Sequence, residues 1–464
     1  MEFSRGLQES LVAILCYRDG SQGASAVAAL VPVSLFDPFY KAIAKEAVDY
    51  ISRYEHAPGS HTLEIFEQLK SRRPKDAGVF DQIFTSLVET NEVINADYVF
   101  EQAATFVRGQ RMRDGIGECL DYLDNDNVDE AASILQKSLE SSHSLFDPGT
   151  RFDDVEKSLA FLHEDHKAFE CGIPELDVYG LGPAKGRLHI FAAPPAGGKS
   201  WWLIHCARHL TYRKTRVLYV TLELAEPDVM QRFAQSVFGM TKRHEKVLKQ
   251  NFKQGENGTS FEIESREIQS RLTLTDERIE ATLKARVKKY HGARNFYVKN
   301  FPTASLTVRE LEAYLDVLEA SEGFIPEVIL VDYADIMKVD EANYRHSVAG
   351  IYRDLRGLAQ KRHVAVATAS QINRGGSQAQ TSGGADIAES YDKVATADVL
   401  ITYNQTGAEH KRGLARLFVA KGRTDRDKFS VIISQSYANG QFCRDSAMMP
   451  GSAYWNEVEK TPDE

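Results

Sequence analysis

The sequence predicts an α/β domain, built on a mostly parallel sheet with helices on both faces, that follows an all-α N-terminal domain. Three observations support this fold class. Residues 1–145 carry only helical periodicity, whereas strands and helices alternate from Cys171 onward, as they do in parallel sheets. Between one such strand and the next helix stands Ala192–Ser200, a loop of small residues that ends in Gly-Lys-Ser.

The chain has the composition of an ordinary globular protein. It is 464 residues long, with 43% hydrophobic and 26% charged residues, and has room for two or three domains. It contains no apolar run of the roughly 18 residues that a membrane span needs, and Met1–Arg5 lacks the apolar core of a signal peptide. The five cysteines are scattered and lack metal-ligand spacing. We therefore expect no membrane association, reduced thiols and a cytoplasmic location.

Charge is distributed unevenly along the chain. Residues 1–150 hold 24 acidic and 13 basic side chains, whereas the remainder holds 42 acidic and 43 basic ones. An acidic surface is a poor docking site for DNA phosphates. Any nucleic acid is therefore expected to meet the second part of the chain.

Residues 1–145 are expected to form a helical collar or assembly domain, because they hold no constellation of catalytic side chains. Their apolar residues recur at helical spacing, and Asp37-Pro38 is a helix start. The expected helices are Leu7–Cys16, Pro38–Tyr54, Leu63–Ser71, Phe80–Thr90, Ala96–Leu123 and Val128–Ser141.

Residues 146–170 are expected to be a linker that contains the amphipathic helix Asp153–His166. An isolated helix of this length is marginal in water, so it would pack either on its own C-terminal domain or on a neighbouring subunit. Residues 171–445 would form the α/β domain. Residues 446–464 are expected to be a disordered acidic tail.

The α/β domain begins with strands separated by helices. Residues 225–292 are expected to be mostly charged helix, and Thr307 and Glu310 form a capping box at the start of a further helix. The expected strands are Leu188–Phe191, Thr215–Thr221, Asn295–Val298, Val328–Asp332, His363–Gln371 and Val399–Tyr403, followed by a hairpin of Leu414–Lys421 and Phe429–Ser436.

The loop that ends in Lys199 and Ser200 fits a phosphate-binding site. Its small residues allow backbone N–H groups to surround a triphosphate, and the helix that follows adds the positive end of its dipole. Lys199 would reach the β- and γ-phosphates, and the Ser200 hydroxyl would bind Mg²⁺. Ala193 stands where the usual pattern begins with Gly. The expected nucleotide contacts are Ala196, Gly197, Gly198, Lys199, Ser200 and Trp201.

Three strands end in polar residues that would face this loop, because the carboxyl ends of parallel strands meet at one edge of a sheet. Asp332 is the candidate for a second Mg²⁺ contact, made through water. Glu223 would polarise the attacking water, or else it is simply an acid at a helix N-terminus. Gln371 would sense the γ-phosphate, or else it is an ordinary loop amide.

Lys421 and Arg423 lie two residues apart at the end of a strand and therefore on one face. The local sequence offers no obvious carboxylate partner for them. They would form a finger that reaches a neighbouring subunit's γ-phosphate and stabilises the transition state, or else they are a solvated hairpin end.

Two later loops could contact nucleic acid without reading its sequence. One contains Lys338 and Arg345, within residues 338–346. The other is rich in glycine and polar residues and contains Arg374, Gly375 and Gly376. Either segment could instead be an ordinary surface loop.

The order of these motifs resembles that of the DnaB-type replicative helicases, whose core is a RecA-like P-loop ATPase. The resemblance covers residues 171–440 and extends more loosely over the helical N-terminal part. The stretches Asp386–Ser390 and Ala395–Asp398 are most similar to the T-even phage members. The other motifs are Cys171–Asp177, Ala193–Ser200, Thr221–Leu224, Val331–Tyr333, Ser370–Arg374 and Lys421–Arg423.

The resemblance implies an ATP-dependent DNA helicase that forms a homo-hexameric ring. ATP or another NTP would bind with Mg²⁺ between subunits, and single-stranded DNA would pass through the pore with 5′→3′ translocation. The resemblance further implies primase and helicase-loader partners, and the host cytoplasm as the location of a phage-encoded member. It also favours packing of the linker helix on the adjacent subunit.

The resemblance divides the site residues between two subunits. It implies that Lys421 and Arg423 act on the neighbour's nucleotide. Bacterial members usually have Arg before the Glu that aligns with Glu389, whereas this chain has Ala388. Glu389 and the neighbouring backbone are therefore further candidates for DNA contact. The residues implied to act within one subunit are Lys199, Ser200, Glu223, Asp332 and Gln371.

Two other functions stay open on the sequence alone. The same core serves RecA-like strand-exchange ATPases that form filaments, although the helical domain and linker helix argue against one. A nucleotide-gated loader or assembly factor would hydrolyse ATP without unwinding DNA. Particle images separate a ring from a filament, and forked DNA with a 5′ tail separates a helicase from a loader.

Overall fold

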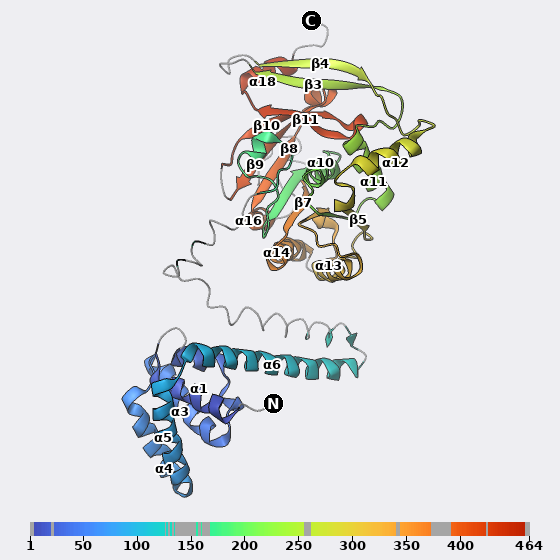
Figure 1. The fold of residues 1–464 in the computed structure, drawn as a ribbon. Helices are drawn as coiled ribbons and strands as arrows, with labels where there is room; N and C mark the ends of the chain where they lie inside the picture. Colours follow the sequence, from blue (N-terminus) through green and yellow to red (C-terminus); the bar gives the residue numbers. More distant parts are fainter. Residues whose placement is uncertain are drawn as a thin grey trace. The chain divides into compact units, whose positions relative to one another are not determined.

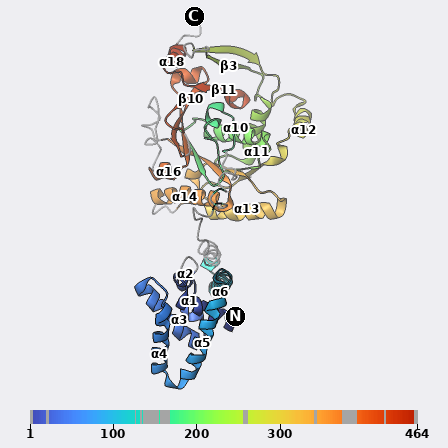
Figure 2. The same cartoon turned by 60° about the vertical axis from the view of Figure 1, so that its left-hand side comes forward.

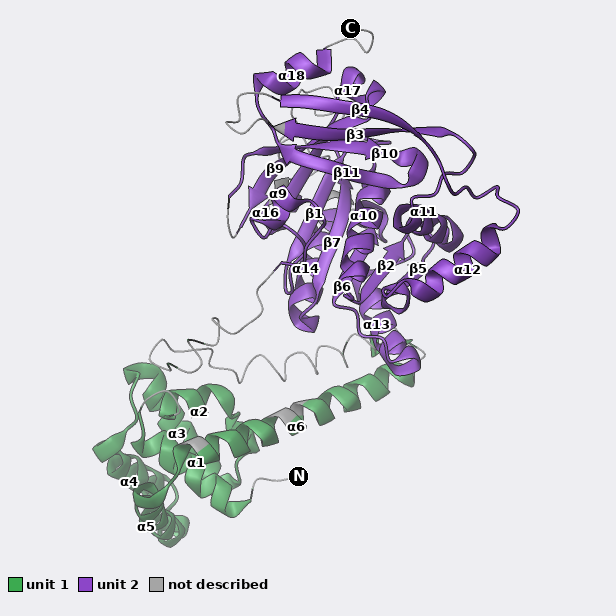
Figure 3. Cartoon of the chain, turned by 45° about the horizontal axis from the view of Figure 1, so that its top comes forward, with its two compact units in different colours: residues 1–160 green, residues 161–464 purple. Residues whose placement is uncertain are grey.

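In the computed structural model the chain forms two compact units, residues 1–160 and residues 161–464 (Figure 3). The described residues are 4–19, 23–125, 168–254, 261–339, 344–372, 391–423 and 426–459, with a few isolated positions between 127 and 159. Most of the predicted linker, including its helix, lies outside them. No helix in the described part of the chain is both long enough and apolar enough to cross a membrane. All five cysteines are free thiols, as expected.

The first unit is all-α, as predicted. One hydrophobic core, which includes Leu11, Ile43 and Phe66, joins its helices. The predicted helix Val128–Ser141 lies mostly outside the described residues. The helices are α1 (Arg5–Tyr17), α2 (Ala24–Leu30), α3 (Pro38–Tyr54), α4 (Thr62–Arg72), α5 (Ala77–Val93) and α6 (Ala96–Leu123), with 3₁₀ turns at Val33–Leu35, Gly59–His61 and Pro74–Asp76 (Figure 1).

The second unit is built on a nine-stranded sheet with the order β11-β10-β9-β8-β1-β7-β6-β2-β5. The strands from β8 to β5 run parallel, and β9, β10 and β11 continue the sheet antiparallel. The prediction of a mostly parallel sheet is confirmed. The strands are β1 (Leu188–Ala193), β2 (Val217–Thr221), β5 (Phe296–Asn300), β6 (Val328–Asp332), β7 (Ala365–Gln371), β8 (Val399–Asn404), β9 (Leu414–Gly422), β10 (Ser430–Ser436) and β11 (Gln441–Met448).

Helices cover both faces of this sheet (Figures 1 and 2). Every residue of β1 is buried, and successive side chains point to opposite faces. Phe191 belongs to a hydrophobic cluster that includes residues of α10 and α11, whereas Ile190 belongs to a second cluster that includes residues of α13 and α14. The helices are α9 (Pro174–Asp177), α10 (Lys199–Tyr212), α11 (Glu226–Phe238), α12 (Ile279–Lys289), α13 (Val308–Glu322), α14 (Tyr344–Arg362), α16 (Tyr391–Thr396), α17 (Gly407–Lys411) and α18 (Ser452–Glu459), with 3₁₀ turns at Ala293–Asn295, Ala334–Ile336 and Tyr437–Asn439.

Residues 225–292 contain a β-hairpin, so the expectation of mostly charged helix is wrong between α11 and α12. Strands β3 (Lys246–Gln254) and β4 (Phe261–Gln269) pair antiparallel as a separate two-stranded sheet. In β4, Phe261 and Ile263 alternate with glutamates, a period of two that a simple count of charges does not detect. The hairpin packs beside β10 and β11 in a small hydrophobic cluster.

Within the expected tail of residues 446–464, residues 446–459 are described and contain the end of a strand and a helix, so the expectation of disorder is wrong for them. Strand β11 continues to Met448, and α18 buries Tyr454 and Val458, which are four residues apart and share one helix face. The Tyr454 hydroxyl donates a 2.6 Å hydrogen bond to Glu409, which also pairs with Arg416 at 2.7 Å. The prediction of disorder rested on acidic composition alone and did not take account of this apolar helix face.

The buried Arg416–Glu409 pair generates a stability prediction. Their side chains are 2% and 0% exposed, so Arg416→Met leaves a buried carboxylate without its cation. We expect the free energy of unfolding to fall by about 3–5 kcal/mol, measured by urea denaturation followed by circular dichroism. The control is Lys284→Met, which removes a pair exposed by more than three quarters on both sides. Equal effects of the two variants would contradict the prediction.

Candidate active site

The predicted phosphate-binding loop joins β1 to α10 with left-handed backbone at two positions. Ala196 and Gly198 have φ of 59° and 83°. The Trp202 N–H donates to the Gly198 carbonyl at 2.8 Å, so α10 begins directly after the loop. Left-handed residues beside helical ones turn successive N–H groups into one concavity, and the helix N-terminus adds its positive end. The loop can therefore hold a phosphate group.

Gly198 is needed for space as well as for backbone conformation. A Cβ atom built there would lie 2.3 Å from the hydroxyl of Tyr437, in the turn after β10. The Tyr437 ring stacks on Trp201 with 5.7 Å between centroids, and the Arg232 guanidinium lies 5.3 Å from the Trp201 ring centroid. These contacts fix Trp201, an expected nucleotide contact, beside the loop.

The carboxyl ends of neighbouring strands bring the predicted polar residues to this loop. Ala193 at the end of β1 pairs with Gln371 at the end of β7, and Thr221 at the end of β2 pairs with Asp332 at the end of β6. Strands β6 and β7 are themselves adjacent. One edge of the sheet therefore holds every residue predicted to act within a single subunit: Lys199, Ser200, Glu223, Asp332 and Gln371.

Asp332 is fully buried and has one oxygen available. Its Oδ2 accepts a 2.6 Å hydrogen bond from the Tyr219 hydroxyl, whereas Oδ1 has no hydrogen-bond partner among the described residues. Burial raises the pKa of Asp332, and the Tyr219 and Ser200 hydroxyls act in the opposite direction. A buried, unsatisfied carboxylate oxygen facing a hydroxyl fits a site for Mg²⁺, which prefers oxygen ligands.

Glu223 and Lys199 lie at the same edge of the sheet as Asp332. Glu223 is exposed, and its negative charge adds to burial in raising the pKa of Asp332. The first turn of α11 is occupied by other acids, Glu226 and Asp228, which weakens the alternative that Glu223 serves only as a helix N-terminal acid. Lys199 Nζ lies 5.2 Å from the centroid of the Tyr333 ring.

Lys421 and Arg423 lie near the opposite edge of the sheet. Strand β9 is antiparallel to β8, so Lys421 pairs with Leu400 near the start of β8, and the start of β8 pairs with the start of β1. The phosphate-binding loop follows the end of β1, which is six residues long. At about 3.3 Å per residue the two edges are about 17 Å apart.

Arg423 has an internal carboxylate partner, which corrects the expectation drawn from the local sequence. Its Nη1 donates to Asp398 Oδ1 at 2.7 Å, across 25 residues of chain. Asp398 is 2% exposed, whereas Arg423 is 48% exposed. Lys421 Nζ donates to the Ala395 carbonyl at 2.9 Å. Burial, with the charge of Arg423 second, lowers the pKa of Lys421.

The expected DNA contacts are only partly covered by the described residues. Lys338 is exposed. Arg345 lies in the first turn of α14, which begins at Tyr344, so the expected loop of residues 338–346 is helical at its end. Arg374, Gly375, Gly376 and Glu389 lie outside the described residues.

Sequence reasoning did not identify Tyr219, Asp335 or Asp398 as parts of the site. Tyr219 is two residues before the end of β2. Its hydroxyl is a polar group on an otherwise apolar strand, and this could have indicated a role at the site. Asp335 follows Asp332 by three residues and accepts the Gln371 N–H at 3.2 Å. Nothing local marks Asp398 as the partner of Arg423, because sheet pairing alone brings them together.

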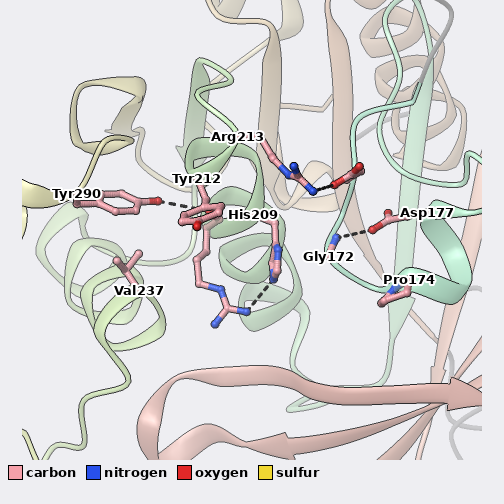
Figure 4. A pocket seen from close by; sticks show the side chains of 10 residues that line it. Gly172, Pro174, Asp177, His209, Tyr212, Arg213, Val237 and Tyr290 are labelled. Carbon is pink, nitrogen blue, oxygen red and sulfur yellow. Dashed lines mark hydrogen bonds and ion pairs between the residues drawn. The ribbon is translucent and has the colours of Figure 1, made fainter.

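A separate pocket of about 520 Å³ lies at the far end of α10 (Figure 4). It is lined by Arg208, His209 and Arg213 among others, and by none of the predicted site residues. Its cations are already engaged: Arg213 pairs with Glu170, and Arg208 donates to the Ser236 carbonyl at 3.2 Å. Burial lowers the pKa of His209 to about 4, so this ring is neutral at pH 7. The pocket is therefore distinct from the phosphate-binding edge.

Comparisons with known proteins show the family of this chain. The family model described as the DnaB-like helicase C terminal domain matches residues 168–438. The DnaB-like replicative helicase of Enterobacteria phage T4 is 21% identical over 379 residues, which are 77% of this chain and 73% of the phage protein. The replicative DNA helicase DnaB of Leifsonia xyli subsp. xyli is 25% identical over 452 residues, which are 92% of this chain and 90% of that protein.

The fold of nearly the whole chain recurs in a solved structure. A DnaB-like replicative helicase, described together with its interactions with primase, superposes with a TM-score of 0.61. The match covers 95% of this chain and 98% of that one, at 14% sequence identity. At this identity the match establishes a shared fold.

The Gly198–Tyr437 approach generates a binding prediction. Gly198→Ala would place a methyl group against the Tyr437 hydroxyl and strain the left-handed backbone, so we expect nucleotide affinity to fall at least about tenfold. Titration with a fluorescent ATP analogue measures this. The control is Gly239→Ala, which has a similar φ of 65° and nothing within 4 Å of the added Cβ. Wild-type affinity in Gly198→Ala would refute the packing argument.

Proposed function

The chain belongs to the DnaB-like helicases and is an ATP-dependent DNA helicase, and from this premise we propose a hexameric ring that translocates 5′→3′ on single-stranded DNA. ATP hydrolysis between subunits would move one strand through the pore and exclude the other, which opens the fork. Replication is the process that such unwinding serves.

The separation of two sets of charged groups carries this proposal. The phosphate-binding loop lies at the carboxyl edge of the parallel strands, and Lys421 and Arg423 lie at the other edge, about 17 Å away. Neither side chain can span that distance to its own chain's nucleotide. We therefore propose that these two cations act on the nucleotide of a neighbouring subunit, in a ring with nucleotide sites between subunits.

Within one subunit, Lys199 and the loop N–H groups would bind the β- and γ-phosphates. Ser200 and Asp332 would hold Mg²⁺. When bound, the metal ion would neutralise negative charge on the phosphates. Glu223, exposed beside this edge, would accept a proton from the attacking water. Gln371 would contact the γ-phosphate from the tip of β7 and sense its loss.

The N-terminal unit would hold the ring together. The second half of α6 exposes Ile116, Leu120 and Leu123 by 46%, 54% and 42%, and their spacing places them on one helix face. An exposed apolar stripe of this kind is suited to contact with another subunit. Primase and a helicase loader are the partners that we propose for the assembled ring.

Single-stranded DNA would pass the loops that follow β6 and β7. Lys338, exposed after β6, supports such a path because a few cations suffice to track a phosphate backbone. The remaining residues proposed to contact DNA are Arg345, Arg374, Gly375, Gly376 and Glu389.

Glu223→Gln tests the proposed reaction. We expect DNA-stimulated ATP hydrolysis to fall about 10²- to 10⁴-fold while ATP binding persists, because only proton transfer is lost. Unwinding of a fork with a 5′ tail should disappear. Glu319→Gln, which changes an exposed acid on α13, is the control and should retain both activities. Hydrolysis by wild type without unwinding would favour a loader, and filaments in electron micrographs would favour a strand-exchange ATPase.

Mixed rings test whether Arg423 acts on the neighbour. Lys199→Ala and Arg423→Ala are each expected to lose hydrolysis. Rings that contain both variants, isolated through two different affinity tags, should regain part of it. In such rings an intact loop from one subunit meets an intact Arg423 from the other. Absence of rescue in doubly tagged rings would refute the action of Arg423 across the interface.

A further inference from the structure

Asp335, in the 3₁₀ turn Ala334–Ile336, is hydrogen-bonded to three other elements of the second unit: β7, α14 and α16. Its Oδ2 accepts the Ser370 hydroxyl at 3.0 Å and the Gln371 N–H at 3.2 Å, both at the tip of β7. Its Oδ1 accepts the Tyr352 hydroxyl of α14 at 2.6 Å and Lys393 Nζ of α16 at 2.7 Å. Asp335 itself stands three residues after Asp332. The backbone of Gln371 is thus held by the same carboxylate that binds Lys393.

Lys393 is buried to an extent that is rare for lysine. Its side chain is 1% exposed, and Nζ lies 5.3 Å from the centroid of the Tyr352 ring. Removing a lysine from water is costly, and a buried ion pair seldom stabilises a fold more than apolar packing would. A contribution to the stability of the fold is therefore a weak explanation for the Lys393–Asp335 pair. Its location supports a different role, in which the pair positions the residues around it.

Helices α14 and α16 are also connected to Lys421 and Arg423 at the other edge of the sheet. Two residues after Lys393, the Ala395 carbonyl accepts Lys421 Nζ at 2.9 Å. Asp398, just beyond α16, binds Arg423 at 2.7 Å and Arg356 of α14 at 3.1 Å. On α14, Arg356 follows Tyr352 by four residues and so lies one helical turn along the same face.

We propose that Lys393 is a positioning residue that couples the two nucleotide sites in which each subunit takes part. Through Asp335 it sets the position of Gln371 in its own site, and through α16 it sets the position of Lys421 and Arg423 for the neighbour's site. This inference rests on the proposed roles of Gln371 and Arg423. A displacement at one edge of the sheet would then move the groups at the other edge.

The first test concerns the subunit's own site. Lys393→Met removes the charge and keeps most of the volume, and we expect kcat for DNA-stimulated ATP hydrolysis to fall roughly ten- to hundredfold with KM little changed. Combined with Gln371→Ala, the same substitution should lower kcat by a smaller factor than it does in wild type, because its action through Gln371 is then already lost and only the action on the neighbour's site remains. An equal factor in both backgrounds would overturn the action through Gln371.

The second test concerns the neighbour's site. Subunits with Lys199→Ala cannot hydrolyse ATP but still offer their finger residues. Doubly tagged rings of wild type with Lys199→Ala should therefore hydrolyse faster than rings of wild type with the double variant Lys199→Ala/Lys393→Met. Equal rates in the two kinds of ring would overturn the coupling.

Two controls keep the outcome interpretable. Lys246→Met removes an exposed ion pair in the β3–β4 hairpin and should leave kcat unchanged. Asp335→Asn breaks the same buried pair without a change in volume, so a normal kcat in a folded Asp335→Asn protein would overturn the inference even if Lys393→Met fails to fold. Absence of DNA-stimulated hydrolysis in wild type would instead refute the proposed function.

Discussion

The direction of the strands is the constraint on which the second unit depends. Parallel strands deliver Asp332 and Gln371 to the edge where the loop after β1 lies. One reversal of direction, between β8 and β9, returns Lys421 and Arg423 to the opposite edge. Because side chains are much shorter than a strand, this reversal divides the proposed catalytic groups into two halves. Under the proposed function, each half would need a complement from another copy of the chain, and assembly and catalysis would be one requirement.

Asp332 and Asp335 are three residues apart, and their different hydrogen bonding suits them to different roles. Asp332 keeps Oδ1 unsatisfied among the described residues, although it is fully buried. Asp335 has four donors on its two oxygens and is 13% exposed. An unsatisfied buried oxygen is unfavourable unless a ligand completes it, whereas a saturated carboxylate has nothing left to offer a ligand. The first therefore suits a metal ion, and the second suits the placement of its neighbours.

The sequence predicted the features that depend on local rules. Apolar strands, the Gly-Lys-Ser loop and the capping box at Thr307 all follow from residues within one or two turns of each other. It failed where residues distant in sequence decide the structure. The hairpin β3–β4 and helix α18 are held by a cluster that joins Phe261 to Tyr454, and Arg423 finds Asp398 only after β8 and β9 pair. In both segments most residues are polar or charged, so composition alone did not predict the few apolar residues that form this cluster.

The internal partner of Arg423 is compatible with a role in a neighbouring site. Breaking a buried ion pair is strongly unfavourable when it leaves one charge without a partner. Asp398 would not be left so, because Arg356 binds both of its oxygens at 3.1 Å and the Leu188 N–H donates to Oδ2 at 3.0 Å. Arg423 is also half-exposed, so its guanidinium gives up little burial when it turns outward. A γ-phosphate presented by another subunit could therefore compete for Arg423 without destabilising the sheet edge that carries it.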